Sequence, residues 1–355
     1  MTKIAIVILN WNGETFLKDF LNPLVKHTPS WAEIVVADNA STDNSISFVR
    51  ENFPQVRIIL NEENYGFSKG YNIALQKIDA EYYCLLNSDV EVSPNWLEPI
   101  IHFLDTHTEV AVCQPKLLSF HDKDTFEYAG ASGGFIDKYG YPFCRGRLFN
   151  TLEKDAGQYD TAIDIFWATG ACMFVRASIY HELGGLDDDF FAHMEEIDFC
   201  WRAKNAGFKV MCYPNSVVYH VGGGTLPKKS SHKTFLNFRN NIILLYKNLP
   251  KRRLPFVFFV RFILDNVAAV RFLFDSGIGD FAAVYKAHLS FYTSLRKNFR
   301  KRSWIKHKHV SQIYNRSIVV DYYLHKKSHF SDLQDTKFSG NKPVQNKREE
   351  YEIII

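Results

Sequence analysis

Acidic side chains are concentrated in one stretch of the chain, between Ala168 and Arg202. Glu195, Glu196 and Asp198 stand there among phenylalanine and isoleucine residues, so a solvated acidic surface does not explain them. Carboxylates that crowd together beside apolar neighbours have raised pKa values, which suit a general base. These three acids are therefore the predicted catalytic residues of a site that removes a proton from a hydroxyl.

The first hundred residues contain the elements that would position such a site. Short β-rich runs alternate with helical patterns, which predicts βαβ units and a mostly parallel sheet. Ligands bind such sheets at the carboxyl ends of the strands. The polar residues that directly follow the expected strands are Asn10, Asp38, the segment 61–66 and Asp89. We therefore expect them to lie along one edge of the sheet.

Two of these strand-end residues have the chemistry to bind a nucleotide. The Asp38 carboxylate can accept hydrogen bonds from a base or a ribose, and the Asn39 amide can both donate and accept them. An Asx turn that caps the next helix is the alternative for both residues.

A glycine-containing loop follows the third expected strand. Asn64, Gly66 and Phe67 lie in it, and Asn72 follows in the next expected helix. Glycine lets the backbone approach a ligand, and N–H groups at the start of a helix favour phosphate or sugar oxygens. A plain turn into the helix is the alternative.

The fourth expected strand ends at Asn87-Ser88-Asp89. A hard divalent cation takes oxygen ligands, and it needs few from the protein when a diphosphate and water supply the rest. Asp89 is therefore the predicted metal ligand, with Ser88 beside it. A structural carboxylate is the alternative.

Beyond residue 93 the pattern is less regular. Helices are expected over residues 94–104 and 195–206, and strands over residues 110–118 and 208–214. Residues 120–160 are rich in Gly, Tyr and Asp with weak periodicity, which predicts a long functional loop with room for a hairpin.

Charge divides the chain into three parts. Residues 1–224 carry 17 Lys and Arg against 30 Asp and Glu, residues 225–316 carry 19 against 3, and residues 317–355 carry 6 against 6. We therefore expect a catalytic domain over residues 1–225 and a basic helical extension over residues 226–316. A polar, poorly ordered tail is expected after them.

The basic extension interleaves Arg and Lys with apolar residues, which is typical of helices on an anionic membrane surface. Packing of these helices on the catalytic domain is the alternative. No nucleic-acid partner is expected, because no motif that binds one is present. The apolar stretch Leu254–Phe274 is interrupted by charges, so we expect no spanning helix. No signal peptide is evident and no C-x-x-C pair occurs, which predicts a cytoplasmic, reducing location.

Seven short motifs carry a resemblance to a known family. They are VILNWNG, VVADNASTDNS, NEENYGFSKGYN, LLNSDVEV, ATGACMF, MEEIDFCWR and YHVGGG, in this order over residues 3–224. The chain resembles family 2 glycosyltransferases, especially the bacterial rhamnosyltransferase-like group that builds surface polysaccharides. The resemblance implies an α/β fold of GT-A type, with a nucleotide-binding, mostly parallel sheet flanked by helices. It also implies sugar transfer from a nucleoside diphosphate to a hydroxyl, with inversion at the anomeric carbon.

The resemblance assigns roles to residues as well. Glu196 occupies the position of the base, and His220 joins Asp89 at a site for Mg²⁺ or Mn²⁺. The glycines after His220 would form a mobile loop over the donor. Trp201 either stacks on a sugar or belongs to the core, and Arg202 either holds a phosphate or pairs with an acid. The residues predicted to bind the donor are Asn10, Asp38, Asn39, Asn64, Gly66, Phe67, Asn72, Ser88, Asp89, Trp201 and Arg202.

Three positions depart from the family pattern. Asn39 stands where the family usually has an Asp that binds uracil or thymine, Asn87-Ser88-Asp89 replaces Asp-x-Asp, and Glu196 replaces Asp. A catalytically degenerate nucleotide-sugar-binding protein is therefore a second hypothesis. A nicotinamide dehydrogenase is disfavoured, because no G-x-G-x-x-G follows the first strand.

The resemblance also implies substrates and a location. The donor is predicted to be dTDP-rhamnose, with a UDP-hexose as the alternative. The acceptor is predicted to be a polyprenyl-linked or surface glycan. The protein is expected to lie peripherally on the inner face of the cell membrane.

Overall fold

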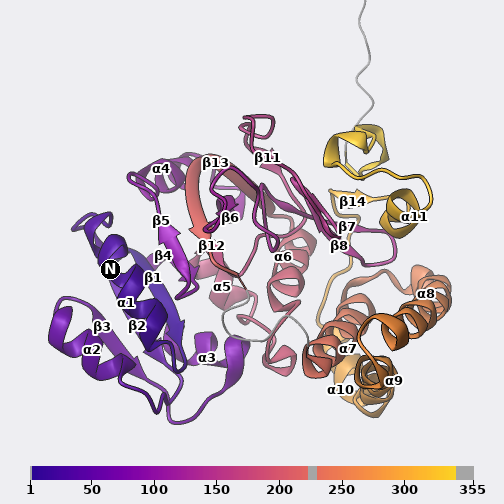
Figure 1. The fold of residues 1–355 in the computed structure, drawn as a ribbon, viewed down its shortest axis with the longest axis horizontal. Coiled ribbons are helices and arrows are strands. Elements are labelled where there is room, and N and C mark those ends of the chain that lie inside the picture. Colours follow the sequence, from indigo (N-terminus) through magenta and orange to yellow (C-terminus); the bar gives the residue numbers. More distant parts are fainter. Residues whose placement is uncertain (1, 223–229, 341–355) are drawn as a thin grey trace, which may run out of the picture.

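The structure, a computed structural model, describes residues 2–222 and 230–340. It contains a large mixed sheet flanked by helices, a small second sheet, and a helical region formed by the later part of the chain (Figure 1). The predicted α/β fold, with a sheet flanked by helices and a later helical region, is confirmed.

The large sheet has nine strands within the described residues, in the order β11-β13-β6-β12-β4-β1-β2-β3, with β5 paired to β13. The strands are β1 (Thr2–Asn10), β2 (Ala32–Asp38), β3 (Arg57–Leu60), β4 (Ala80–Leu86), β5 (Val90–Val92), β6 (Val110–Ser119), β11 (Ile163–Asp164), β12 (Cys172–Arg176) and β13 (Lys209–His220). Strands β4, β1, β2 and β3 are parallel to their neighbours in this run, whereas β12 is antiparallel to both β4 and β6. The parallel strands come from the part of the chain where strands and helices alternate.

Successive side chains of a strand point to opposite faces of a sheet, and on β1 both sets of side chains are buried. On β1, Ala5 and Val7 belong to one hydrophobic core, and Ile4, Ile6 and Ile8 belong to the other. The helices of this part of the chain are α1 (Glu14–Lys26), α2 (Ser45–Asn52), α3 (Gly66–Leu75), α4 (Glu98–Thr106), α5 (Ala177–Glu182), η1 (Asp188–Phe190) and α6 (Glu195–Ala206). All six cysteine side chains are buried.

Residues 120–160, predicted as a long loop with room for a hairpin, contain several very short strands. They are β7 (Gly134–Asp137), β8 (Pro142–Cys144), β9 (Arg147–Leu148) and β10 (Thr151–Leu152), and β14 (Ile313–Tyr314) joins them from far along the chain. Strands of two to four residues are too short to display an alternating pattern, so a five-stranded sheet could not be predicted here.

The helical region begins at Ser231. It comprises α7 (Ser231–Asn248), η2 (Lys251–Arg253), α8 (Leu254–Asp275), α9 (Ile278–Thr293) and α10 (Leu295–Ser303). Pro250 and Pro255 mark the predicted break between the first two long helices. None of the helices in the described part of the chain combines the length and the hydropathy that crossing a bilayer requires.

The structure differs from the expected poorly ordered tail over residues 317–340. These residues form α11 (Ile318–Tyr323), η3 (Phe330–Asp332) and η4 (Asp335–Lys337). The ring centroids of Phe330 and Phe338 lie 4.9 Å and 5.3 Å from that of Phe135, so aromatic packing holds this polar segment on the small sheet. Residues 341–355 lie outside the described residues.

Candidate functional site

Polar residues meet at the carboxyl ends of β1 and β2, as expected. Asn10 and Asp38 are register partners, and the Asn10 amide donates to Asp38 Oδ1 at 2.9 Å. The Asp38 carboxylate also accepts hydrogen bonds from the backbone N–H and the hydroxyl of Ser41, at 2.9 Å and 2.6 Å. Asp38 therefore forms the turn that was the alternative prediction. Asn10 Oδ1 is buried and has no hydrogen-bond partner among the described residues.

The Asn39 amide connects the next loop to this edge. Its Oδ1 accepts from Asn61 Nδ2 at 2.8 Å, and its Nδ2 donates to the Gly66 carbonyl at 3.0 Å. Asn64 Oδ1 in turn accepts the Gly66 N–H at 3.0 Å. Gly66 has a φ of +74°, where a side chain would be strained, and it begins α3. These amides thus fix the shape of the glycine loop.

A histidine lies between two acids at the end of β13. His220 Nε2 is 3.1 Å from Asp89 Oδ1, and its Nδ1 is 3.2 Å from Glu127 Oε1. Burial lowers the pKa of His220, but hydrogen bonds with Asp89 and Glu127 outweigh it and raise the value to about 10. Burial raises the pKa of Asp89, but His220 lowers it further, so the net direction is down.

Asp89 has the carboxylate oxygen that a divalent cation takes, and His220 offers an imidazole nitrogen once it gives up its proton. Two protein ligands leave positions for diphosphate and water, so the residues fit such an ion. Within residues 2–222 and 230–340, no group of three or more His, Cys, Asp or Glu side chains is arranged to hold a metal. Gly223 and Gly224, predicted to cover the donor, lie outside the described residues.

Of the two glutamates at the start of α6, Glu195 is buried and Glu196 is partly buried, and both are poorly partnered. Burial, and then the neighbouring Glu196, raise the pKa of Glu195. Burial raises the pKa of Glu196 to about 7. The Oε2 atom of each carboxyl is buried and has no hydrogen-bond partner among the described residues. A carboxylate poised near neutral pH with a free oxygen has the properties of a general base.

A turn at Gly170 brings the donor loop and the glutamates together. A Cβ at Gly170 would lie 3.2 Å from the Phe67 ring and 4.0 Å from Glu196 Cβ. The next residue, Ala171, accepts the Asn87 N–H at 2.9 Å, which holds the Asn87-Ser88-Asp89 segment at the same place. The loop after β3, the end of β4 and the start of α6 therefore converge.

The segment before Glu195 has an unusual backbone. Phe191, His193 and Met194 have φ values of +62°, +71° and +74°. Such conformations cost about 1–3 kcal/mol each and concentrate at functional sites. The Phe191 carbonyl accepts the Phe67 N–H at 2.7 Å, so this strained segment also supports the glycine loop.

Helix α7 stabilises the strained segment from outside the sheet. Asn240 Nδ2 lies 2.9, 2.8 and 2.7 Å from the carbonyl oxygens of Phe190, Ala192 and His193. Arg239 donates to the Phe190 carbonyl at 3.1 Å. The helical extension therefore helps to build the candidate site.

Comparison with known proteins assigns the family. The family model described as "Glycosyl transferase family 2" matches residues 5–184. The chain belongs to this family. The resemblance predicted from the seven motifs is thus confirmed.

Relatives of this glycosyltransferase carry related names. It is 24% identical over 246 residues to "Low-salt glycan biosynthesis hexosyltransferase Agl10" of Haloferax volcanii, covering 68% of this chain and 74% of that one. It is 22% identical over 318 residues to "N-acetylglucosaminyl-diphospho-decaprenol L-rhamnosyltransferase" of Mycobacterium tuberculosis, covering 84% and 96%. It is 23% identical over 222 residues to "Rhamnosyltransferase WbbL" of Escherichia coli, covering 59% and 80%.

A solved structure shares the fold of the glycosyltransferase. The crystal structure of GalNAc-T7 with UDP, GalNAc and Mn²⁺ superposes with a TM-score of 0.56 at 17% identity, over 71% of this chain and 49% of that one.

Three residues predicted at the site of the glycosyltransferase lie in its structural framework instead. The Trp201 ring is buried and packs 5.1 Å from that of Phe166, measured between centroids, so it offers no face to a sugar. Arg202 donates to Asp198 Oδ2 at 2.8 Å and to backbone carbonyls, so it pairs with an acid as the alternative proposed. Asp198 is fully buried and also accepts from Lys247 at 2.9 Å, which leaves it no role as a base.

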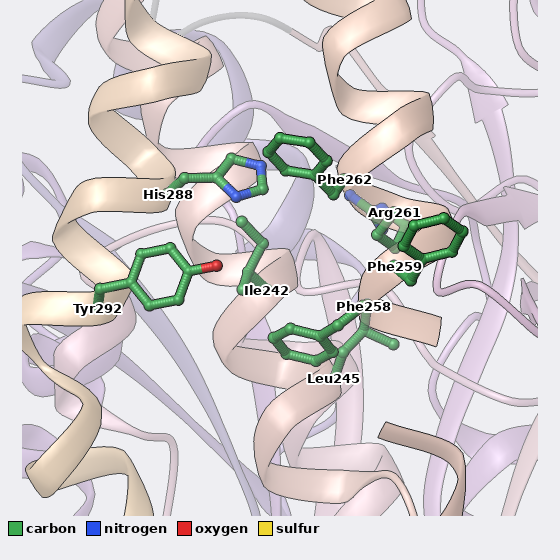
Figure 2. Close-up of a pocket in the computed structure, with 8 residues that line it drawn as sticks. All are labelled: Ile242, Leu245, Phe258, Phe259, Arg261, Phe262, His288 and Tyr292. Atoms are coloured by element: carbon green, nitrogen blue, oxygen red, sulfur yellow. The ribbon is translucent and has the colours of Figure 1, made fainter. Parts of the chain in front are cut away.

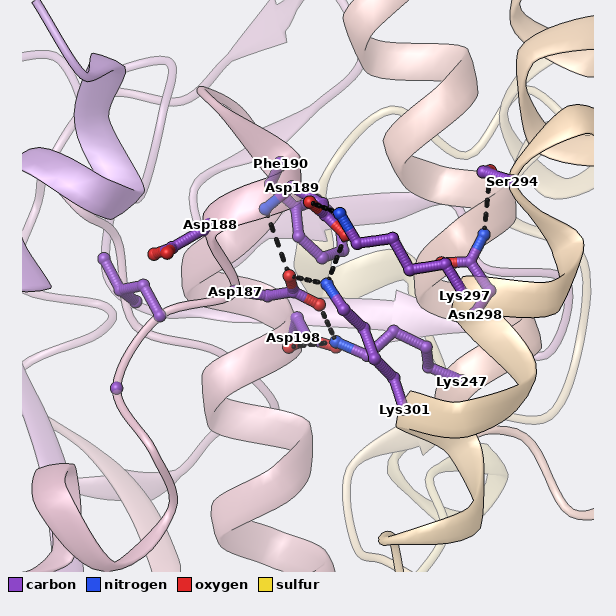
Figure 3. A network of polar contacts seen from close by, with 12 residues as sticks. Asp187, Asp188, Asp189, Phe190, Asp198, Lys247, Ser294, Lys297, Asn298 and Lys301 are labelled. Carbon is purple, nitrogen blue, oxygen red and sulfur yellow. Dashed lines mark hydrogen bonds and ion pairs between the residues drawn. The ribbon is translucent and has the colours of Figure 1, made fainter.

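Lys247 belongs to a network of acids and lysines that joins α6 and η1 to the helical extension (Figure 3). Lys247 and Lys301 both pair with Asp187, and Lys301 also pairs with Asp189. Burial raises the pKa of Asp187, but these two lysines lower it well below its ordinary range. Of the three predicted catalytic acids, Asp198 therefore belongs to a structural network.

Asn72 also belongs to the framework. Its amide donates to the Leu186 carbonyl at 2.8 Å and to Asp188 at 2.6 Å, and its oxygen accepts from Tyr180 at 2.6 Å. No polar group of Asn72 remains for a donor.

Three residues near the glycosyltransferase site, Glu127, His193 and Asn240, are not among those predicted from the sequence. Glu127 and His193 were overlooked because each lies in a segment with weak periodicity. His193 Nε2 is buried without a partner among the described residues, and burial lowers its pKa to about 4. Asn240 could have been recognised from the sequence, because asparagine is unfavourable inside a helix and here interrupts an apolar helical pattern.

Proposed function

We propose that this glycosyltransferase transfers a sugar from a nucleoside diphosphate to an acceptor hydroxyl, with inversion at the anomeric carbon. The observation that carries the proposal is the Glu196 carboxylate, with its pKa near 7 and an unpartnered oxygen beside the Phe67 and Gly170 turn. Inversion requires one base on the face opposite the leaving group.

The proposed reaction is a single displacement. Glu196 accepts the proton of the acceptor hydroxyl while the hydroxyl oxygen forms a bond to the anomeric carbon. The bond from that carbon to the diphosphate oxygen breaks, and the nucleoside diphosphate leaves. Burial and the neighbouring Glu196 raise the pKa of Glu195 as well.

The strand-end residues would hold the donor. Asn10 has an unpartnered side-chain oxygen. Gly13 lies between this oxygen and the Ser88 hydroxyl, because a Cβ at Gly13 would be 2.3 Å from Asn10 Oδ1 and 3.7 Å from Ser88 Oγ. A divalent cation, when bound by Asp89 and His220, supplies positive charge that neutralises the leaving diphosphate.

Rhamnose from dTDP-rhamnose is the donor that we propose. Two of the relatives described above are named rhamnosyltransferases, and one of their names specifies a decaprenol-linked acceptor. A UDP-hexose is the alternative, favoured by the relative named a hexosyltransferase. The acceptor is proposed to be a polyprenyl-linked or surface glycan at the cytoplasmic face of the membrane.

Calorimetric titration with dTDP-rhamnose, UDP-glucose, UDP-GlcNAc and GDP-mannose tests the donor. Binding of dTDP-rhamnose that requires Mg²⁺ or Mn²⁺ and is lost in EDTA is the expected result. Binding of a UDP-sugar alone would replace rhamnose by the alternative.

The degenerate, non-catalytic protein is the second candidate, favoured by Asn39 and Glu196 at positions where the family has aspartate. Glu196→Gln separates the two, because an enzyme would lose turnover and still bind donor. A wild-type protein that binds donor but transfers no sugar to water or to any lipid-linked glycan would favour the second candidate.

A further inference from the structure

Exposed apolar side chains gather on α8, α9 and α10. On α8, Phe256, Phe259, Val267 and Phe274 are 62%, 65%, 63% and 82% exposed. Together with two further exposed residues, Ile263 and Val270, they recur at intervals of three and four along the helix, which places them on one face. Monomeric soluble proteins rarely leave such a stripe uncovered.

Helix α9 continues this surface. Leu289 and Tyr292 on α9 are exposed, and a cavity of about 270 Å³ between α7, α8 and α9 is lined by Phe259, Phe262 and Tyr292 (Figure 2). Tyr285 on α9 also donates to Asn266 on α8 at 2.8 Å. The exposed stripes of α8 and α9 are therefore continuous, and we call their combined surface the α8–α9 face.

Arg261 and His288 in the cavity wall are already paired. Arg261 and His288 both lie within 3.1 Å of Asp265, which is fully buried. The cavity therefore offers an apolar surface rather than a charged one.

Charge around the α8–α9 face has one sign. Of the acids on α8–α10, Asp265 and Asp280 are buried, and Asp275 is paired with Arg271. Lys251, Arg252, Lys286, Arg296 and Arg300 are exposed on these helices or at their ends. Trp304, after α10, is 83% exposed, and tryptophan favours the interface between lipid and water.

We infer that the α8–α9 face docks on an anionic lipid bilayer. Apolar side chains enter the headgroup region, and the surrounding Lys and Arg bind anionic headgroups. A second copy of the chain fits less well, because two basic faces would repel each other.

This inference deepens the proposed function, on which its biological purpose rests, because a polyprenyl-linked acceptor is held at a bilayer. Helix α7 packs against α9, and its Asn240 holds the segment before Glu195. The docked face is therefore connected to the candidate base through a single helix.

Flotation of the full chain with vesicles of phosphatidylcholine containing 30 mol% phosphatidylglycerol, about a third of the lipid, tests the inference. Binding to these vesicles, weakened by high salt and by omission of the anionic lipid, is the expected result. Phe259→Glu combined with Phe274→Glu should lower the partition coefficient at least about tenfold. Arg252→Glu combined with Lys286→Glu should lower it about fivefold or more per residue.

Matched controls place the same changes elsewhere. Trp31→Glu changes an exposed aromatic residue between α1 and β2, and Arg50→Glu changes an exposed base on α2, so both should bind vesicles as the wild type does. Light scattering on the same samples reports oligomeric state. A dimer that Phe259→Glu with Phe274→Glu dissociates would overturn the inference in favour of a second copy.

Donor titration on the same variants separates this inference from the proposed function. Wild-type protein that binds a nucleotide sugar but not anionic vesicles overturns the docking face alone. Protein that binds vesicles through this face but no nucleotide sugar overturns the proposed function alone.

Discussion

Replacing Glu196 by Gln should stabilise the protein at alkaline pH while abolishing sugar transfer. Burial raises the pKa of Glu196 from an ordinary value of 4.5 to about 7, so the fold disfavours the ionised carboxylate. This penalty is absent below the unfolded value, grows as the pH rises from 4.5 to 7, and is constant above. The difference is worth about 3 kcal/mol above pH 7.

The net gain from Glu196→Gln is smaller than this penalty. The new amide would stand where Oε2 now has no partner, which costs about 1 kcal/mol. A gain of about 2 kcal/mol remains, which is roughly 3 °C in Tm for a chain of this length. At pH 5 both side chains are neutral, and the two proteins should melt close together.

Thermal denaturation of wild type and Glu196→Gln at pH 5 and pH 8.5, together with turnover at pH 8.5, measures both effects. Glu51→Gln, at an exposed position on α2, is the control and should change neither. A Tm difference between wild type and Glu196→Gln that is the same at pH 5 and pH 8.5 would contradict this prediction. A carboxyl whose pKa is raised in the fold must make that difference depend on pH.

Three further predictions concern the residues around this base. Asn240→Ala should lower kcat about tenfold, because about 1–3 kcal/mol of hydrogen bonding to the strained segment is lost; Asn298→Ala, a buried asparagine of α10, should lower Tm but leave kcat intact, and equal kcat for both would contradict this. His220→Ala should remove the difference between donor affinities measured calorimetrically with Mn²⁺ and with EDTA, and a persisting difference would exclude His220 as a ligand. Lys247→Met should lower the free energy of unfolding in urea by about 3 kcal/mol at pH 7, because Asp187 and Asp198 lose a shared cation; an unchanged unfolding midpoint would contradict this.

The strands of the parallel sheet and the residues at their ends could be predicted from the sequence. Asn10, Asp38 and Asp89 directly follow apolar strands, and parallel strands bring their carboxyl ends to one edge. Predicting these positions needs only the local pattern and this rule of sheet topology. In the structure, Asn10 and Asp38 are in contact.

Contacts between distant segments could not be predicted in the same way. Glu127 meets His220, and Asn240 meets His193, through chain paths that no local pattern specifies. The role of Trp201 could not be predicted either, because a tryptophan on α6 has the same sequence pattern whether its ring faces a ligand or packs in the core. Pairing of β14 with β7 needs a partner far along the chain.

The opposite charges of the two parts of the chain now divide into two roles. Lys247 and Lys301 both pair with Asp187, close to α6, so part of the basic charge joins the later helices to the part of the chain that contains the large sheet. The Lys and Arg side chains around the α8–α9 face remain exposed. The net charge of the extension counts both groups together. The paired lysines stabilise the fold, whereas the exposed Lys and Arg residues are available to an anionic surface. Membrane association therefore has to be tested at the exposed Lys and Arg residues, since substituting the paired lysines would disrupt the site itself.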